Sequence, residues 1–255
     1  MARPCALALL AAAPVLAQHP EMVLIPEGAF QMGRAHSLPD DGLEWVPHLL
    51  RDDRPVRTVV LDAFEIDEHE VTNREYAEFV ESGEAVKAPF YWPGGSPPPG
   101  RSDDPVANVT WDEADAYCRW RGKRLPTEAE WEKACRGGLA EGKYPWGDED
   151  ATGELAHFDS VKGPKAVCTY EKNGYGLCDM AGNVWEWTAD WYDRHYYGDG
   201  PSEHPAGPAE GRYRVLRGGS WADVPKFLTC AHRSYARPQE RSPNLGIRCA
   251  RNPDR

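Results

Sequence analysis

The sequence predicts a single α+β domain with little regular secondary structure. Three observations lead to this fold class: short helix candidates that share one start signal, short strand candidates near the N-terminus, and long segments rich in Gly and Pro between them. The chain has 255 residues, a length typical of one domain or two small ones. Ten Trp and a 41% hydrophobic share can build a core, and neither an internal repeat nor a linker divides the chain.

Residues 1–17 have the pattern of a signal peptide, and we expect the domain to span residues 20–255. Arg3 supplies the positive n-region, residues 6–13 are apolar, and residues 15–17 form a small-residue cleavage site. The alternative is a wrongly assigned start codon or an apolar tail. No other apolar run is long enough to span a bilayer, so we expect a periplasmic or secreted protein.

The chain is acidic, with 41 Asp and Glu against 29 Lys and Arg and a formal charge of −12. A surface of this sign repels nucleic-acid phosphates and anionic membranes. We therefore expect no nucleic acid and no membrane as a partner, but acidity alone does not name one. Separately, we expect a monomer with a peptide or small-molecule ligand of unknown identity.

Residues 22–33 and 56–66 are the strand candidates. The first segment alternates in polarity around Pro26, Glu27 and Gly28, which predicts a β-hairpin within it. The second, V-R-T-V-V-L-D-A-F-E-I, is rich in β-branched residues and predicts a strand.

Three helix candidates begin with the same capping box, in which a Thr hydroxyl accepts from the third helical amide and a Glu reaches back. The boxes lie at residues 72–75, 110–113 and 127–130. Gly122 and Gly137 stand where the second and third helices should end. Each helix has only about three turns, so its stability must come from packing.

Six cysteines remain once Cys5 leaves with the signal peptide, an even number that predicts disulfides in an exported chain. Six thiols allow about fifteen pairings, and spacing alone does not choose among them. No C-x-x-C pair occurs, so neither a zinc ribbon nor a thioredoxin-like motif is indicated. The six are Cys118, Cys135, Cys168, Cys178, Cys230 and Cys249.

Residues 173–191, N-G-Y-G-L-C-D-M-A-G-N-V-W-E-W-T-A-D-W, combine three Gly, three Trp and several acids and amides. Gly permits tightly folded backbone, and the polar residues interrupt any apolar periodicity. We expect a compact irregular loop that carries oxygen ligands and lies against aromatic side chains. Two later segments accompany it, R-V-L-R-G-G-S-W at 214–221 and N-L-G-I-R-C-A at 244–250.

Together with G-K-R-L-P-T-E-A-E-W-E-K-A-C-R-G-G at residues 122–138, these segments resemble the sulfatase-modifying-factor family, which includes the formylglycine-generating enzymes. Further matches are E-V-T-N-R-E-Y-A-E-F-V at 70–80 and V-T-W-D-E-A-D-A-Y-C at 109–118. The likeness extends from about residue 22 to residue 251, in the family's order. It implies a single low-regularity α+β domain with the formylglycine-generating-enzyme fold, which is related to the C-type lectin fold.

The resemblance also implies a disulfide pattern. Cys118 matches the helix cysteine that pairs with the one in the final N-L-G-x-R-C, here Cys249. Cys135 matches the partner of the cysteine at position 230. Cys168 and Cys178 are then left over, ten residues apart, and could close their own loop or stay free.

The family further implies one structural calcium in the central loop. Its ligands map onto the Asp179 side chain, the Gly182 and Val184 carbonyls and the Glu186 carboxylate. Calcium takes several hard oxygens in flexible geometry, so the chemistry is reasonable. The alternative is that Asp179 and Glu186 only accept hydrogen bonds from loop amides.

Copper is not expected. In formylglycine-generating enzymes two cysteines follow the G-G-S-aromatic motif and hold copper(I) as thiolates, which are soft ligands suited to that ion. Here Asp223 takes the first ligand position and Leu228 the approximate second. Neither side chain is a copper(I) ligand.

The candidate catalytic residues are Trp185, Ser220, Asp223 and His232. Trp185 and Ser220 match residues that line the family's active pocket, and Asp223 or His232 would act as acid or base near neutral pH. The alternative is structural: Trp185 is core, Ser220 caps a turn, and Asp223 forms an ion pair with Arg233.

These features leave it open whether the protein is an enzyme. The first hypothesis is a divergent exported oxidoreductase that acts on a peptide or small molecule without the copper dithiolate, as a similar pyoverdine-maturation oxidase does. The second is a non-catalytic lectin-like module that binds a ligand. The third, a formylglycine-generating enzyme, would need two free thiols near Ser220.

Overall fold

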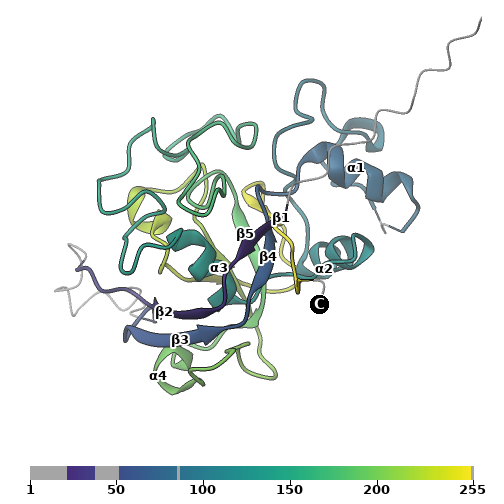
Figure 1. Cartoon of the computed structure of the whole chain (residues 1–255). Helices are drawn as coiled ribbons and strands as arrows, with labels where there is room; N and C mark the ends of the chain where they lie inside the picture. The colour runs from purple at the N-terminus through teal and green to yellow at the C-terminus, as the bar shows by residue number, and fades with distance from the viewer. Residues whose placement is uncertain (1–21, 38–51, 85–86, 254–255) are drawn as a thin grey trace, which may run out of the picture.

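A computed structural model describes residues 22–37, 52–84 and 87–253, so the predicted signal peptide at residues 1–17 lies outside the described part (Figure 1). The described residues form a single α+β domain of short elements joined by long irregular segments, as predicted. The strands are β1 (Met22–Ile25), β2 (Gly28–Met32), β3 (Arg57–Leu61), β4 (Phe64–Asp67), β5 (Trp185–Trp191), β6 (Arg214–Arg217), β7 (Ser234–Ala236), β8 (Leu245–Gly246) and β9 (Ala250–Arg251). The helices are α1 (Asn73–Glu81), α2 (Trp111–Trp120), α3 (Glu128–Arg136) and α4 (Tyr196–Asp199), with 3₁₀ turns η2 (Pro93–Gly95) and η3 (Pro225–Leu228).

The strands form three small sheets, in the orders β1-β4-β9, β2-β3 and β7-β6-β5-β8. The hairpin predicted within residues 22–33 is wrong. β1 pairs with β4 and β2 pairs with β3, so the segment 22–32 runs antiparallel to 57–67 (Figure 1). Strand pairing is interrupted at the same place in both segments. Ile25, the last residue of β1, lies opposite Phe64, and Gly28, the first residue of β2, lies opposite Leu61. The alternation of polar and apolar residues in 22–33 suits a hairpin within the segment and pairing with residues 57–67 equally well. It therefore could not show which strands pair.

All three predicted capping boxes are present, at Thr72, Thr110 and Thr127. α3 ends at the predicted Gly137, whose φ of 58° is left-handed. A Cβ at this position would lie 2.8 Å from the Gly174 backbone nitrogen, so the helix end and the central loop require Gly here. α2 ends at Trp120, and its C-cap is Arg121, one residue before the predicted Gly122.

The two disulfides that the resemblance implies form, Cys118–Cys249 and Cys135–Cys230. The pairing that the sequence left open is settled as a third bridge, Cys168–Cys178. The first two bridges join short helices to distant C-terminal segments, across 131 and 95 residues. Three bridges are typical of a protein from an oxidising compartment. Among the described residues, no helix has the length and apolar character needed to cross a bilayer.

The C-terminal segment closes the fold against elements from the start of the chain. β9 pairs with β4, and the Arg124 and Ala250 backbones exchange two hydrogen bonds. The Cys249 amide donates to the Asp67 carboxylate at 3.0 Å. The Asn244 carbonyl accepts from the Trp185 amide at 2.8 Å, where β8 lies parallel to β5.

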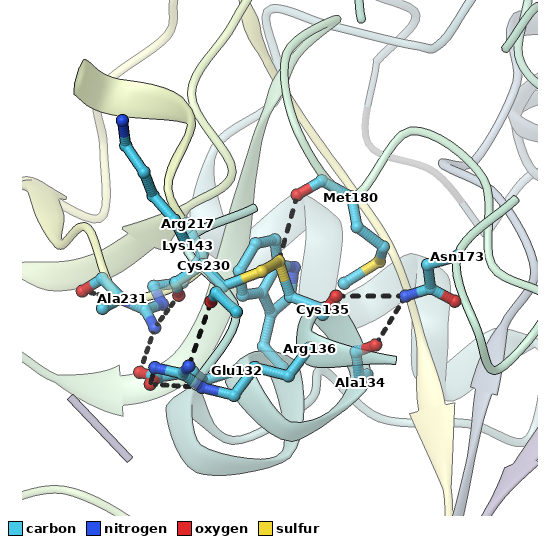
Figure 2. The surroundings of a disulfide bond; sticks show 12 residues. Glu132, Ala134, Cys135, Arg136, Lys143, Asn173, Met180, Arg217, Cys230 and Ala231 are labelled. Carbon is cyan, nitrogen blue, oxygen red and sulfur yellow. Dashed lines mark hydrogen bonds and ion pairs between the residues drawn. A yellow bond between two sulfur atoms is a disulfide. The ribbon is translucent and has the colours of Figure 1, made fainter. Parts of the chain in front are cut away.

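A buried ion-pair network surrounds the Cys135–Cys230 bridge (Figure 2). Glu132 of α3 accepts from Arg217 of β6 at 2.5 Å and from Arg136 at 2.7 Å, and all three side chains are 5% exposed or less. The Gly33 amide also donates to Glu132 Oε1, and the Tyr197 hydroxyl donates to Oε2, both at 2.7 Å. Glu132 therefore connects α3, β6, α4 and the end of β2 through hydrogen bonds that satisfy both carboxylate oxygens.

Candidate functional site

The backbone after β6 brings the candidate catalytic residues together. Gly218 and Gly219 have φ values of 100° and 74°, so the chain leaves the strand through two left-handed positions. A Cβ at Gly219 would lie 2.8 Å from the Phe227 carbonyl oxygen. The G-G-S-W motif thus needs its glycines in order to turn Ser220 back toward the Asp223 loop.

Ser220, Asp223 and Trp185 form a hydrogen-bonded cluster. The Ser220 hydroxyl and the Trp185 indole nitrogen both donate to Asp223 Oδ2, the latter at 2.9 Å. Ser220 Oγ in turn accepts from the Asn244 side-chain amide at 2.8 Å. The sequence predicted the first three residues but missed Asn244, whose motif had been connected only with Cys249.

His232 lies next to this cluster through its ring. The imidazole is 5.9 Å from the Trp185 ring and 5.0 Å from the Phe227 ring, measured between centroids. Burial, together with the positive charges of Arg217, Arg34 and Lys226, lowers the pKa of His232 to about 3. His232 is therefore neutral at pH 7, and the expectation that it titrates near neutral pH is not met. Asp223 is left as the ionisable member of the group.

The suggested Asp223–Arg233 ion pair is wrong. Arg233 forms a two-bond ion pair with Glu128, at 2.7 and 2.9 Å, and donates to the Asp52 carbonyl. Its side chain is fully buried. A buried guanidinium requires a buried carboxylate partner, and α3 supplies one.

The low pKa of His232 makes stability depend on pH in a defined direction. Between about 6.5, the ordinary value, and about 3 the unfolded chain binds a proton that the folded chain does not. The free energy of unfolding therefore falls as pH falls through this window. We expect His232→Asn to flatten the stability profile there, measured by urea unfolding at successive pH values. His204→Asn, at a side chain 54% exposed, is the control and should follow the unmodified protein. Parallel profiles for His232→Asn and the unmodified protein would contradict the expectation.

The candidate calcium ligands lie in the turn that precedes β5. Asp179 accepts from the Cys168 amide at 2.6 Å, and burial raises its pKa. The Gly182 and Val184 residues are buried, and no hydrogen bond from the described residues reaches either carbonyl oxygen. Two buried carbonyls beside a carboxylate are oxygen donors of the type that calcium takes.

Glu186 is held differently from the other candidate ligands. Its carboxylate is fully buried, pairs with Arg248 at 2.8 Å and accepts from the Trp131 indole at 2.6 Å. Oε2 accepts hydrogen bonds from the Trp131 indole and from Arg248 Nε, and Oε1 accepts one from Arg248 Nε and lies 2.8 Å from Arg248 Nη2. Direct coordination of calcium by Glu186 would require it to give up one of these contacts.

The sequence reasoning missed Glu70 in this region. Glu70 is fully buried and accepts from the Asn183 side chain at 2.7 Å and from the Val184 amide at 3.0 Å. Burial, reinforced by Asp179 and Glu186, raises its pKa well above the ordinary value. Three carboxylates, Glu70, Asp179 and Glu186, thus face one guanidinium, that of Arg248. The excess of negative charge favours a cation, and together with the two carbonyls it fits calcium.

The residues at the family's copper positions do not fit copper(I). Asp223 offers a hard carboxylate, and Leu228 is a buried hydrocarbon side chain. All six cysteines in the described residues are in disulfides, and a disulfide is not a thiolate ligand.

An apolar cavity of about 410 Å³ lies beside the G-G-S-W motif. Phe90, Tyr91 and Trp221 line it together with prolines from several loops. Asn108 also lines it, is 5% exposed, and its side-chain amide makes no hydrogen bond to the described residues. The cavity therefore offers aromatic walls and one unused polar group. The sequence indicated only an irregular loop at residues 88–105.

The fold and this site define a disulfide-bonded, irregular α+β domain with a central ligand-bearing loop and a G-G-S-W cluster. Residues 8–253 match the family described as the sulfatase-modifying factor enzyme 1-like domain, and the chain belongs to this family. It is 38% identical over 290 residues to the formylglycine-generating enzyme of Streptomyces coelicolor, covering 91% of this chain and 89% of that protein.

Two further relatives extend this comparison. The hercynine oxygenase of Mycolicibacterium smegmatis is 34% identical over 272 residues, and the match covers 89% of this chain but 60% of that protein. The structure of PvdO from Pseudomonas aeruginosa superposes with a TM-score of 0.75 at 30% identity, covering 91% of this chain and 94% of that one.

Proposed function

We propose that this chain is an exported oxidoreductase that oxidises a peptide or small molecule with dioxygen as electron acceptor, without a copper dithiolate. The observation that carries the proposal is the hydrogen-bonded Ser220–Asp223–Trp185 cluster, built on the family's G-G-S-W motif. The likeness to a formylglycine-generating enzyme and to a hercynine oxygenase supports the reaction class.

Each residue of the cluster has a distinct task in this proposal. A two-electron oxidation releases protons from the substrate, and the Asp223 carboxylate accepts one of them as general base. The Ser220 hydroxyl and the Trp185 indole fix the carboxylate and stabilise its charge. The neutral His232 ring bounds the cluster on one side without adding a charge.

The neighbouring cavity would bind the apolar part of the substrate. Its aromatic and proline walls suit a flat or apolar group, and the Asn108 amide supplies one donor and one acceptor. Trp221 connects this cavity to the cluster, because it belongs to the same motif as Ser220.

The test is oxygen consumption by the mature protein with a C-x-P-x-R peptide and with free cysteine as probes, followed by product mass. We expect turnover, and we expect Asp223→Asn to lower kcat by about 100-fold or more, the typical contribution of a general base. Asp103→Asn, at a carboxylate whose side chain is 57% exposed, is the control and should keep full activity.

Two results would contradict this function. Saturable binding of the peptide without oxygen consumption would identify a binding module instead. Equal turnover by Asp223→Asn and the control would remove Asp223 from the chemistry.

We also propose one structural calcium, held by the Asp179 side chain and the Gly182 and Val184 carbonyls, with Glu186 and Glu70 balancing its charge. A ligand at 100 times its Kd stabilises a folded protein by about 2.7 kcal/mol. We therefore expect a chelator to lower Tm, and Asp179→Ala to abolish the difference between calcium and chelator. Asp150→Ala, at a side chain 95% exposed, is the control. A Tm that is equal in calcium and chelator would disprove the site.

Export completes the proposal. It is supported by the signal-peptide pattern of residues 1–17 and by three disulfides. N-terminal mass analysis of the protein from the producing cells should find a mature chain that begins at residue 18. An intact chain that begins at Met1 would contradict it.

A further inference from the structure

The Cys168–Cys178 bridge lies beside the carboxylate of Glu68. None of these three residues belongs to the G-G-S-W cluster or lines the cavity. One oxygen of Glu68 and the two sulfur atoms all lie within 4.8 Å of one another. We propose that reduction of this disulfide opens a zinc site whose ligands are Cys168, Cys178 and Glu68. The oxidised bridge closes the site, because zinc is bound by thiolates and a disulfide has none.

Solvent access singles out this bridge among the three. Cys168 is at least partly accessible to solvent, whereas Cys118, Cys135, Cys178, Cys230 and Cys249 are all 0% exposed. A small thiol or phosphine must reach a sulfur atom to open a disulfide, and here it can attack Cys168. The bridge also closes a loop of 10 residues, against 95 and 131 for the others. Chain entropy therefore stabilises it least.

Both cysteines are held by hydrogen bonds that do not depend on the bridge. The Cys178 amide donates to the Glu68 carbonyl at 2.8 Å, and the Cys178 carbonyl accepts from Arg248 at 2.9 Å. The Cys168 amide donates to the Asp179 carboxylate at 2.6 Å. The opened thiols therefore stay close to Glu68.

The geometry needs only small adjustments. Ligand atoms on tetrahedral zinc lie roughly 3.3–3.8 Å apart for bonds of about 2.0–2.3 Å. Cys178 Sγ already lies 4.0 Å from the Glu68 carboxylate. In the disulfide the two sulfurs are bonded, so they must move apart to become separate zinc ligands. Cys168 lies on an irregular loop, and a shift of this loop can provide that movement. Lys172, which pairs with Glu68 and is 51% exposed, can turn to solvent when zinc binds.

The chemistry balances in two steps. Two molecules of a small thiol give two electrons and two protons to the disulfide, which yields two cysteine thiols and one molecule of the external disulfide. Zinc then binds both sulfurs as thiolates and releases two protons to solvent. The carboxylate is the third ligand and water the fourth, as is common for open zinc sites.

The experiment measures zinc binding by the full-length mature protein before and after mild anaerobic reduction with a phosphine, in excess calcium. Bound zinc is counted by mass spectrometry of the metal, and thiols are mapped by alkylation. We expect about one zinc per chain after reduction and none before. We also expect zinc to protect Cys168 and Cys178 from alkylation, while the other four cysteines remain bridged.

Two variants test the ligand set. Glu68→Gln keeps the bridge and should weaken zinc binding by about 10-fold or more. The double variant Cys168→Ser/Cys178→Ser should lose binding by more than the roughly 10- to 100-fold that outer-shell changes cost. Its fold is checked by circular dichroism, and Glu171→Gln, at a neighbouring exposed carboxylate, is the control. Equal zinc affinity before and after reduction, or earlier opening of a buried bridge, would overturn the proposal. Unchanged affinity in Glu68→Gln would do so for the three-ligand site.

Discussion

Replacing Glu132 with alanine is expected to lower the free energy of unfolding by about 3–5 kcal/mol, the typical cost of removing one partner from a buried ion pair. The carboxylate is 0% exposed. Without it, Arg136 would lose the carboxylate that it pairs with, and Arg217 would keep only Glu128, at 3.7 Å. The Tyr197 hydroxyl and the Gly33 amide would lose their acceptor as well. Urea unfolding followed by tryptophan fluorescence measures the change.

The matched control is the exposed pair Arg74–Asp103, whose side chains are 53% and 57% exposed. Asp103→Ala should cost about 0–1 kcal/mol. Although burial opposes it, the attraction of Arg136 and Arg217 holds the pKa of Glu132 below its ordinary value. Its contribution is therefore present above pH of about 4.3 and is lost as pH falls further. Comparable losses in Glu132→Ala and Asp103→Ala would show that the network does not stabilise the fold.

Removal of the Cys118–Cys249 bridge should cost about 5 kcal/mol on the chain-entropy model, since it closes 131 residues. Removal of Cys168–Cys178, which closes 10 residues, should cost about 3 kcal/mol on the same model. The paired Cys→Ala variants, compared by urea unfolding, measure this difference. A larger loss for Cys168–Cys178 would mean that native-state strain, rather than loop length, sets the order.

The sequence predicted those parts of the fold that depend on local chemistry. The capping boxes at Thr72, Thr110 and Thr127 were predicted because Thr and Glu three residues apart satisfy each other's backbone groups. Partner choice between strands was not predictable in the same way. The side chains of β1 and β2 alternate between polar and apolar in a way that suits any neighbouring strand. Tertiary packing decides that the two strands belong to different sheets.

Site residues that belong to a recognised sequence motif were predicted. Site residues that contact the motif from distant parts of the chain were missed. Ser220 and Asp223 lie close in sequence, and Trp185 belongs to the central stretch. Asn244 lies directly before β8 and Glu70 lies between β4 and α1, and they reach Ser220 and Val184 across 24 and 114 residues. The neutral state of His232 also depends on burial and on distant cations, which residue spacing does not reveal.

The attachment of the last strands to the first ones has a consequence for the order of folding. β9 completes the sheet of β1 and β4, and Arg248 donates to the Asp67 carbonyl, 181 residues earlier. Contacts of such long range form slowly, because the loop-closure entropy must be overcome before they stabilise anything. During synthesis the N-terminal sheet must therefore wait, incomplete, until residues 244–251 have left the ribosome. For the export proposed above, this late completion means that the N-terminal sheet is still open when the chain reaches a translocation channel.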